Sequence, residues 1–292
     1  MNITVCIKQV PDSTEVKVKE NTGTLIRDEI SSQINPYDLY ALETALQIKE
    51  SVSGKISVIT LGEEHSHQII KEAYMMGADE GFLVSDKRFN GSDVYVTAYI
   101  LSQAIKRFTE STVILCGKKS TDSGTSHLAS ELAEILNIPC LTNIRRIINI
   151  KEDSLTVEAD MEDSLIQAEI KTPCILSVDE SIAEPRLLSF RKKLQTNDRE
   201  IKRIYLEELE DKNEYNYGLK GSPTNISKLY PAENFSEKTK ALNEKKLSPE
   251  GSPLQLKRIF PEGVDSGKEI WSGASIGLAE NIYTKLKELK HV

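Results

Sequence analysis

The stretch that decides the fold runs from Val113 to Leu136 and reads VILCGKKSTDSGTSHLASELAEIL. It predicts a buried strand over Val113–Gly117, then a loop of small polar residues, then a helix over Ser126–Leu136. Such a loop directs backbone N–H groups and the positive end of the helix dipole toward an anion, which is usually a phosphate. Thr125 and Ser126 are also good N-cap residues, so the stretch fits a plain helix cap equally well.

The chain before this stretch repeats the alternation of strand and helix. The strand candidates are short, apolar and mostly β-branched, which is typical of parallel strands buried on both faces. The helix candidates carry apolar residues at three- and four-residue spacing. The expected strands are Ile3–Val10, Ile56–Leu61, Gly81–Ser85 and Val113–Gly117, and the expected helices are Tyr37–Glu50, His65–Met76, Val94–Phe108 and Ser126–Leu136. This order predicts an open, mostly parallel sheet with helices on both faces, whose ligands bind beyond the carboxyl ends of the strands.

Two further features extend this α/β pattern. Alternating runs at Ile144–Ile150 and Leu155–Ala159 predict a β-hairpin insertion, and Leu165–Ile170 adds another strand before a buried one at Pro173–Val178. Beyond Ile182 the apolar residues become sparse and scattered, which predicts an extended C-terminal arm that packs on another protein. We therefore expect an α/β domain over residues 1–190 and a C-terminal extension over residues 191–292.

Composition excludes several classes of function. A net charge of −8 argues against binding to a nucleic-acid backbone, and no apolar run is long enough to span a membrane. The chain begins with a strand and not with a secretory signal, so we expect a cytoplasmic protein. The four cysteines lie in or beside apolar runs, and neither they nor the four histidines show metal-ligand spacing. We expect no metal site and identify no catalytic side chain.

Five motifs then appear in the order in which the β subunits of electron-transfer flavoproteins carry them. They are VCIKQVPD at 5–12, INPYDL at 34–39, MGADE at 76–80, CGKK at 116–119 and EPR at 184–186. The resemblance covers about the first 200 residues. Gly23–Arg27 and Gly218–Thr224 further resemble the flavin-bifurcating members from anaerobes.

The resemblance implies an α/β domain of the adenine-nucleotide-binding type that pairs with an α subunit carrying FAD. In simple carriers of this family the β subunit binds AMP, whereas in bifurcating members the same pocket holds a second FAD that accepts a hydride from NADH. We therefore expect FAD in the pocket, with AMP as the alternative. The implied partners are the α subunit, a dehydrogenase, and ferredoxin or flavodoxin as a candidate acceptor, and the flavin supplies the redox chemistry.

The resemblance also implies which residues line the pocket. Carried over by position, these are Cys6, Asn35, Pro36, Tyr37, Asp38, Leu61, Asp122, Ser123, Gly124, Thr125, Ser126 and His127. Asn35 and Asp38 can hydrogen-bond to the base or ribose, and the later loop offers donors to phosphate. The stretch at 35–38 fits a helix N-terminus with proline in the first turn equally well. Phe190 falls at the position of an apolar anchor that docks the dehydrogenase.

The chain departs from the family pattern at three places. The family loop reads Asp-Gly-Asp-Thr with a Gln two residues on, whereas here Ser123 and Gly124 follow Asp122, and His127 replaces the Gln. One carboxylate beside the phosphates is lost, so anion binding should survive or improve, and the flavin contact that the family makes from the Gln position falls here to His127, a different side chain. The charges that follow Phe190 also differ, so the identity of the dehydrogenase does not transfer.

Two classes compete with this interpretation. An ATP-using ligase or pyrophosphatase of a related fold needs a glycine-rich phosphate loop directly after the first strand, but Lys8–Asp12 contains no glycine. A nucleotide-binding sensor without a redox role is the other class, and the long C-terminal arm argues against it because such an arm implies a permanent partner.

Overall fold

The computed structural model of the chain describes residues 1–12, 32–161 and 163–224. The Gly23–Arg27 motif and the C-terminal part of the expected arm, from residue 225 onward, lie outside these described residues.

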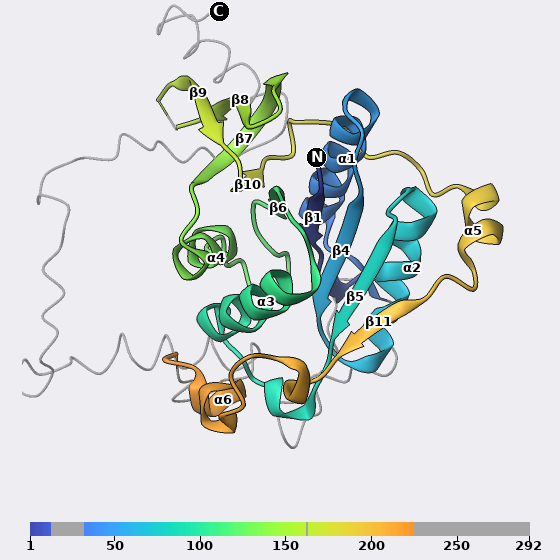
Figure 1. The fold of residues 1–292 in the computed structure, drawn as a ribbon, viewed down its shortest axis with the longest axis vertical. Helices are drawn as coiled ribbons and strands as arrows, with labels where there is room; N and C mark the ends of the chain where they lie inside the picture. Colours follow the sequence, from blue (N-terminus) through green and yellow to red (C-terminus); the bar gives the residue numbers. More distant parts are fainter. Residues whose placement is uncertain (13–31, 162, 225–292) are drawn as a thin grey trace, which may run out of the picture. The chain divides into compact units, whose positions relative to one another are not determined.

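A nine-stranded sheet with the order β11-β5-β4-β1-β6-β10-β7-β8-β9 forms the centre of the fold (Figure 1). The strands from β11 to β7 in this order run parallel, and β7, β8 and β9 form an antiparallel meander. The mostly parallel α/β sheet and its hairpin insertion, both predicted from the sequence, are therefore confirmed. The strands are β1 (Ile3–Cys6), β4 (Ile56–Leu61), β5 (Glu80–Val84), β6 (Val113–Gly117), β7 (Cys140–Ile150), β8 (Ser154–Asp160), β9 (Leu165–Lys171), β10 (Cys174–Val178) and β11 (Ile201–Ile204).

Helices cover both faces of this sheet. On one face α1 (Pro36–Ser51) and α2 (His67–Met76) share a hydrophobic cluster with the strands, and on the other face α3 (Val94–Phe108) and α4 (Leu128–Leu136) do so. The short helix α5 (Phe190–Thr196) packs on α2, and α6 (Gly218–Gly221) is the last helix of the described residues. Short 3-10 turns lie at Glu64–Ser66, Lys87–Phe89, Leu206–Glu208 and Glu214–Asn216. No helix within the described ranges is long and apolar enough to cross a membrane.

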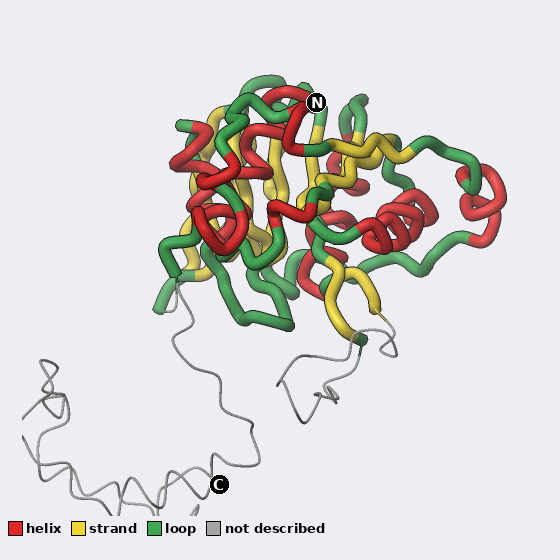
Figure 2. The backbone as a smooth tube through the Cα atoms, turned by 90° about the horizontal axis from the view of Figure 1, so that it is seen from below, coloured by secondary structure: helices red, strands yellow, loops and turns green. Residues whose placement is uncertain are grey.

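The first strand is shorter than the sequence predicts. The run Ile3–Val10 was expected to form one strand, but β1 ends at Cys6, and β2 (Gln9–Pro11) pairs antiparallel with β3 (Ser32–Ile34) in a separate ribbon (Figure 2). The chain leaves the main sheet because the backbone N–H of Lys8 donates to the carboxylate of Asp38 (2.8 Å) instead of to a neighbouring strand. This departure opens the sheet beyond the end of β1.

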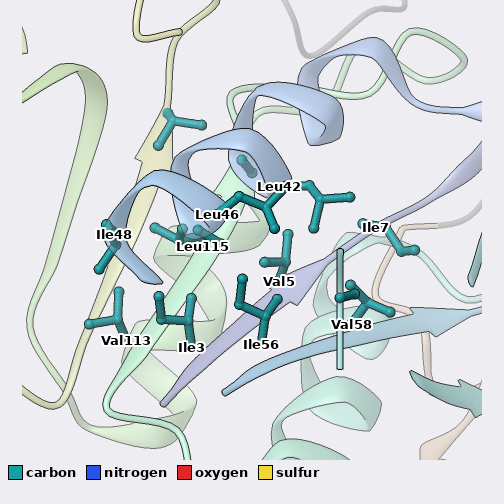
Figure 3. Close-up of a cluster of buried hydrophobic side chains, with 14 of the residues drawn as sticks. Ile3, Val5, Ile7, Leu42, Leu46, Ile48, Ile56, Val58, Val113 and Leu115 are labelled. Atoms are coloured by element: carbon teal, nitrogen blue, oxygen red, sulfur yellow. The ribbon is translucent and has the colours of Figure 1, made fainter. Parts of the chain in front are cut away.

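Alternation along β1 divides the core into two layers. Ile3 and Val5 pack under α1, where they meet Leu42 and Leu46 (Figure 3). Cys6 belongs to the cluster on the opposite face, beneath α3 and α4. Successive side chains of a strand point to opposite faces, so a strand buried on both faces must be apolar at nearly every position.

The helix after β6 begins later than expected. The sequence predicts a start at Ser126 with Thr125 or Ser126 as the cap, but α4 starts at Leu128, and its N-cap residue, His127, makes no side-chain capping bond. The hydroxyl of Thr125 lies 3.3 Å from that of Ser123, within the loop. The first turn of α4 therefore keeps backbone N–H groups without a side-chain cap.

Residues 201–217, which the sequence assigns to the extension, contribute to the α/β core. Strand β11 pairs in parallel with β5 at the edge of the sheet, and Leu206, Leu209 and Tyr217 are buried in the cluster beneath α3. These apolar residues stand among many charged ones and form no sustained periodic run, so the sequence pattern does not predict their burial. All described residues belong to one compact unit. The packing of residues 225–292 on a partner stays a prediction.

Candidate functional site

A cavity with a volume of about 650 Å³ lies beyond the carboxyl ends of β1, β4 and β6. The chain runs from β1 outward to β4 and β5 and then crosses to β6, on the other side of β1. The connections therefore diverge between β1 and β6, and open α/β sheets bind their ligands in the crevice at such a point. The volume falls in the range of small-molecule and cofactor sites, about 300–1,000 Å³.

The structure brings most of the predicted site residues to this cavity. Eight of them line it, namely Cys6, Asn35, Asp38, Leu61, Asp122, Ser123, Thr125 and Ser126. The other four, Pro36, Tyr37, Gly124 and His127, do not line it. Pro36 and Tyr37 form the first turn of α1, as the alternative interpretation of that stretch predicts. Binding by any of these residues stays a prediction.

Asn35 and Asp38 connect the two loops that border the cavity. The buried amide of Asn35 donates to the carbonyl oxygen of Lys119 (2.9 Å) and accepts from the N–H of Thr121 (3.2 Å). The carboxylate of Asp38 accepts hydrogen bonds from the backbone of Lys8 and of Gly117. These side chains thus hold the ends of β1 and β6 together, and their polar groups already have partners in the protein.

The carboxyl group of Asp38 sits in an unusual electrostatic environment. Burial raises its pKa to about 7, although hydrogen bonds from Asn35, Lys8 and Gly117 and the charge of Lys8 act in the opposite direction. Desolvation disfavours the charged form of a buried acid. The protonation of this group therefore changes close to neutral pH.

The loop after β6 combines positive charge with hydroxyl groups. Lys8 Nζ lies 2.6 Å from a carboxylate oxygen of Asp122, so a lysine from the loop after β1 reaches across to the loop after β6. Burial alone would raise the pKa of Asp122, but the hydrogen bond and charge of Lys8 lower it on balance. The hydroxyls of Ser120 and Ser123 lie 2.7 Å apart and exposed to solvent. Together with the uncapped N-terminus of α4, these groups suit an anion.

Gly124 is the turning point of this loop. Its φ of +66° lies in the left-handed region, and a Cβ at this position would have open space around it. The glycine is therefore required by the backbone conformation and not by close packing.

Sequence reasoning missed one wall of the cavity, which comes from the loop between β5 and α3. This wall includes Asp86, Phe89, Asn90, Gly91, Ser92 and Asp93, and Thr224 joins it from the C-terminal segment. Asp93 caps α3 by accepting from the N–H of Val96 (3.0 Å), and an acidic residue just before a helical pattern is a signal that could have located it. Thr224 ends the Gly218–Thr224 motif, but nothing in the sequence predicts its contact with this wall, because 131 positions separate it from its partner Asp93.

The cysteines occupy core positions. Cys6, Cys116 and Cys174 are buried and Cys140 is half-buried, and all four are free thiols. The side-chain hydrogen bond between Cys116 and Cys6 is the largest cause that raises the pKa of Cys116, followed by burial, so this thiol stays neutral. Within the described parts of the chain, no three His, Cys, Asp or Glu side chains gather as metal ligands.

Phe190 lies on an exposed apolar surface at the start of α5. Its side chain is 70% exposed, and Leu187 and Leu194 beside it are also exposed. The segment before it is held to α1 because Arg186 bonds both carboxylate oxygens of the buried Glu43, at 2.8 Å each. The ion pair therefore anchors the segment whose apolar side chains are exposed to solvent.

The fold and the cavity define an open, doubly wound α/β protein with a cavity at the point where its strand order reverses. Residues 22–209 match the electron transfer flavoprotein domain family. The chain is 42% identical over 228 residues to the electron transfer flavoprotein subunit beta of Thermoanaerobacterium thermosaccharolyticum, an alignment that covers 77% of this chain and 86% of that protein. It is 34% identical to the caffeyl-CoA reductase-Etf complex subunit CarD of Acetobacterium woodii, over the full length of both chains. It is 31% identical to protein FixA of Azotobacter vinelandii, which covers 92% of this chain and 98% of that one.

The chain therefore belongs to the electron transfer flavoprotein family, and the resemblance to its β subunits is confirmed. Its role at the coarse level is that of an electron-transfer subunit. The cofactor in its cavity, the electron donor and the acceptors are the subject of the proposal that follows.

Proposed function

We propose that this chain works in the cytoplasm as the β subunit of an electron-bifurcating heterodimer and that its cavity holds FAD, with AMP as the alternative. When bound, this FAD would accept a hydride from NADH and send electrons to the α-subunit FAD, to a dehydrogenase and to a low-potential acceptor such as ferredoxin or flavodoxin. The observation that carries the proposal is that the loop suited to an anion borders a cofactor-sized cavity at the switch point.

The residues of the cavity fit an adenine nucleotide. Cys6, Leu61 and Cys116 give its floor an apolar character that suits a planar base. The hydroxyls of the loop after β6, Lys8 and the N–H groups at the start of α4 supply donors and positive charge for phosphate. These donors come from separate segments of the chain, so they can contact both phosphate groups of a diphosphate.

The side chains of this protein bind and orient the nucleotide and do not react with it. Asn35 and Asp38 hold the loops after β1 and β6 in register, so that the phosphate donors converge on one place. Lys8 neutralises part of the negative charge, and Asp122 holds the Lys8 side chain across the mouth of the cavity.

The nucleotide content of the purified heterodimer tests this proposal. After co-expression with the α subunit and denaturation, we expect two FAD per heterodimer and no AMP. One FAD with one AMP would make the protein a simple electron carrier. One FAD with no nucleotide in the β subunit would overturn the assignment of the cavity.

We further propose that the exposed surface of Leu187, Phe190 and Leu194 docks the dehydrogenase. Three neighbouring apolar side chains on a fixed base are typical of an interaction site, because a buried aromatic anchor contributes strongly to binding. Charged Arg191 and Lys193 in the same helix would favour an acidic rim on the partner.

The substitution Phe190→Ala tests the docking surface. With a CoA-ester reductase or dehydrogenase as electron acceptor, we expect the KM for this acceptor to rise about tenfold, which corresponds to ~1.4 kcal/mol. The flavin content and melting temperature should not change, because the side chain is 70% exposed. Ile148→Ala, at a 43% exposed position on β7, is the matched control. An unchanged KM in Phe190→Ala would place docking elsewhere.

A further inference from the structure

The C-terminal segment Tyr217–Thr224, here called the strap, crosses the loop that forms one wall of the cavity. This loop, residues 86–93, joins β5 to α3 and contributes Phe89, Asn90 and Asp93 to the cavity lining. The strap lies more than 120 residues further along the chain, yet its last residue, Thr224, lines the same cavity. The strap and the wall are therefore parts of one structural unit.

Several hydrogen bonds join the strap to the wall, among them one from the hydroxyl of Ser222 to the carbonyl oxygen of Gly91 (3.3 Å). The backbone N–H of Asp93 donates to Ser222 Oγ (2.9 Å), and the N–H of Thr224 donates to a carboxylate oxygen of Asp93 (3.0 Å). The N–H of Leu219 donates to the carbonyl oxygen of Asn90 (3.2 Å). Ser222 is buried and its hydroxyl donates in turn to the carbonyl oxygen of Gly218 (2.7 Å). These bonds satisfy both backbone and side-chain groups of Asp93.

Gly218 allows the strap to approach the wall. Its φ is +58°, and a Cβ at this position would press on the carbonyl oxygens of Arg88 and Asn90, 2.8 Å from the latter. A side chain would therefore meet both backbone strain and a steric clash with rigid backbone. The chain can close on the wall only with glycine here.

Tyr217 fixes the start of the strap. Its side chain is buried, its ring lies 5.4 Å from the ring of Phe89, and its hydroxyl accepts from Gln103 on α3 (3.1 Å). Phe89 itself lines the cavity. The strap is thus anchored to α3 at one end and reaches the cavity at the other.

We infer that Gly218, Ser222 and Thr224 are positioning residues for the nucleotide, because they hold Asp93 and Phe89 in place in the wall of the cavity. This inference rests on the proposed nucleotide site. Asp93 is a carboxylate in a cavity that takes an anionic ligand, and the strap compensates its charge by donating the N–H of Thr224, while Val96 donates to the other oxygen. Without the strap, this carboxylate would be free to turn toward the nucleotide and repel it.

Variants of the strap in the complete heterodimer test the inference. Gly218→Ala introduces the clash, Ser222→Ala removes the acceptor for the N–H of Asp93, and Ser222→Thr keeps the hydroxyl. Leu219→Ala is the matched control, because this strap residue is 60% exposed and keeps its Cβ. The readouts are the ratio of β-subunit nucleotide to α-subunit FAD after dialysis, the Kd for added FAD or ADP, and the melting temperature of the nucleotide-free protein.

We expect Gly218→Ala and Ser222→Ala to raise the Kd at least tenfold and to lose β-subunit nucleotide, while their content of α-subunit FAD does not change. Ser222→Thr and Leu219→Ala should keep the wild-type Kd and the wild-type nucleotide content. If Gly218→Ala does not fold, Ser222→Ala decides. A wild-type Kd and a wild-type nucleotide content in Ser222→Ala would overturn the inference. It would also be overturned if nucleotide were lost only in variants whose nucleotide-free protein melts at a lower temperature. A wild-type heterodimer without any β-subunit nucleotide would instead overturn the proposed function, and this inference with it.

Discussion

At the scale of single residues, Asp38 is the point where the two borders of the cavity meet. Its carboxylate accepts from the backbone of Lys8 and of Gly117, which follow or end the adjacent parallel strands β1 and β6, and the connections after these strands lead to opposite sides of the sheet. The sequence predicts a polar role for this residue but assigns it to the ligand. Its thirty-residue separation from Lys8 explains why a local pattern cannot identify the partner.

Stability should depend on pH through Asp38. Burial raises its folded-state pKa to about 7, above the value of about 3.9 for an exposed aspartate. Between these values the folded protein binds more protons than the unfolded chain, so this group's contribution to stability falls as pH rises, by at most ~1.4 kcal/mol per pH unit. Urea unfolding of wild type and Asp38→Asn between pH 4 and 7 checks this. The wild type should lose stability relative to the variant, and the opposite trend would mean that the backbone hydrogen bonds outweigh burial.

Lys8 and Asp122 should affect nucleotide binding in opposite directions. Lys8→Gln removes a positive charge from the cavity and should raise the Kd. Asp122→Asn releases Lys8 from its 2.6 Å ion pair, so this lysine can meet the nucleotide and the Kd should fall. Both side chains are partly exposed, so we expect modest changes of about two- to tenfold in Kd, or ~0.4–1.4 kcal/mol. Calorimetric titration of ADP into the nucleotide-free heterodimer at low salt measures them. Lys151→Gln, whose ion pair lies on the distant hairpin, is the control, and equal effects of both cavity variants would contradict the prediction.

At the scale of elements, the loop between β6 and α4 depends on the conformation of Gly124. A β-branched residue at φ +66° is strongly disfavoured, at a cost of roughly 1–2 kcal/mol or more, whereas asparagine tolerates this region. Gly124→Val should therefore weaken nucleotide retention about tenfold and leave the α-subunit FAD in place, while Gly124→Asn stays within about twofold of wild type. Nucleotide release during dialysis distinguishes them. Equal retention in Gly124→Val would mean that the loop does not contact the ligand.

Elements were predictable where a single physical pattern determines them. Ile56–Leu61 and Val113–Gly117 are short, mostly apolar runs rich in β-branched residues, and both form strands with the expected bounds. Strand β11 gives no such signal, because Lys202 and Arg203 are exposed at the edge of the sheet and only Ile204 is buried. Ligands of parallel sheets bind beyond the carboxyl ends of the strands, and this rule predicted the parts of the cavity that follow β1, β4 and β6. The wall after β5 depends on contacts with the strap, which only the tertiary structure reveals.

At the scale of the whole molecule, the C-terminal residues divide into two groups with different expected roles. A chain truncated after Thr224 keeps β11 and the buried Leu206, Leu209 and Tyr217, so it should fold cooperatively and bind the α subunit more weakly. A chain truncated after Glu200 loses all of these, which leaves the edge of β5 unpaired and prone to association with other chains. Size-exclusion chromatography and thermal unfolding of the two truncations check the difference. Aggregation of both chains to the same extent would contradict it.

The pairing of β11 with β5 also has a consequence for synthesis on the ribosome. Gly81 leaves the ribosome about 120 residues before its partner Ile201, which at 5–20 residues per second is a delay of roughly 6–24 s. During this interval the strand Glu80–Val84, with Phe82, Leu83 and Val84 fully buried in the finished protein, has a free edge. We therefore expect the nascent chain to rely on chaperones or on transient contacts of its own until β11 emerges.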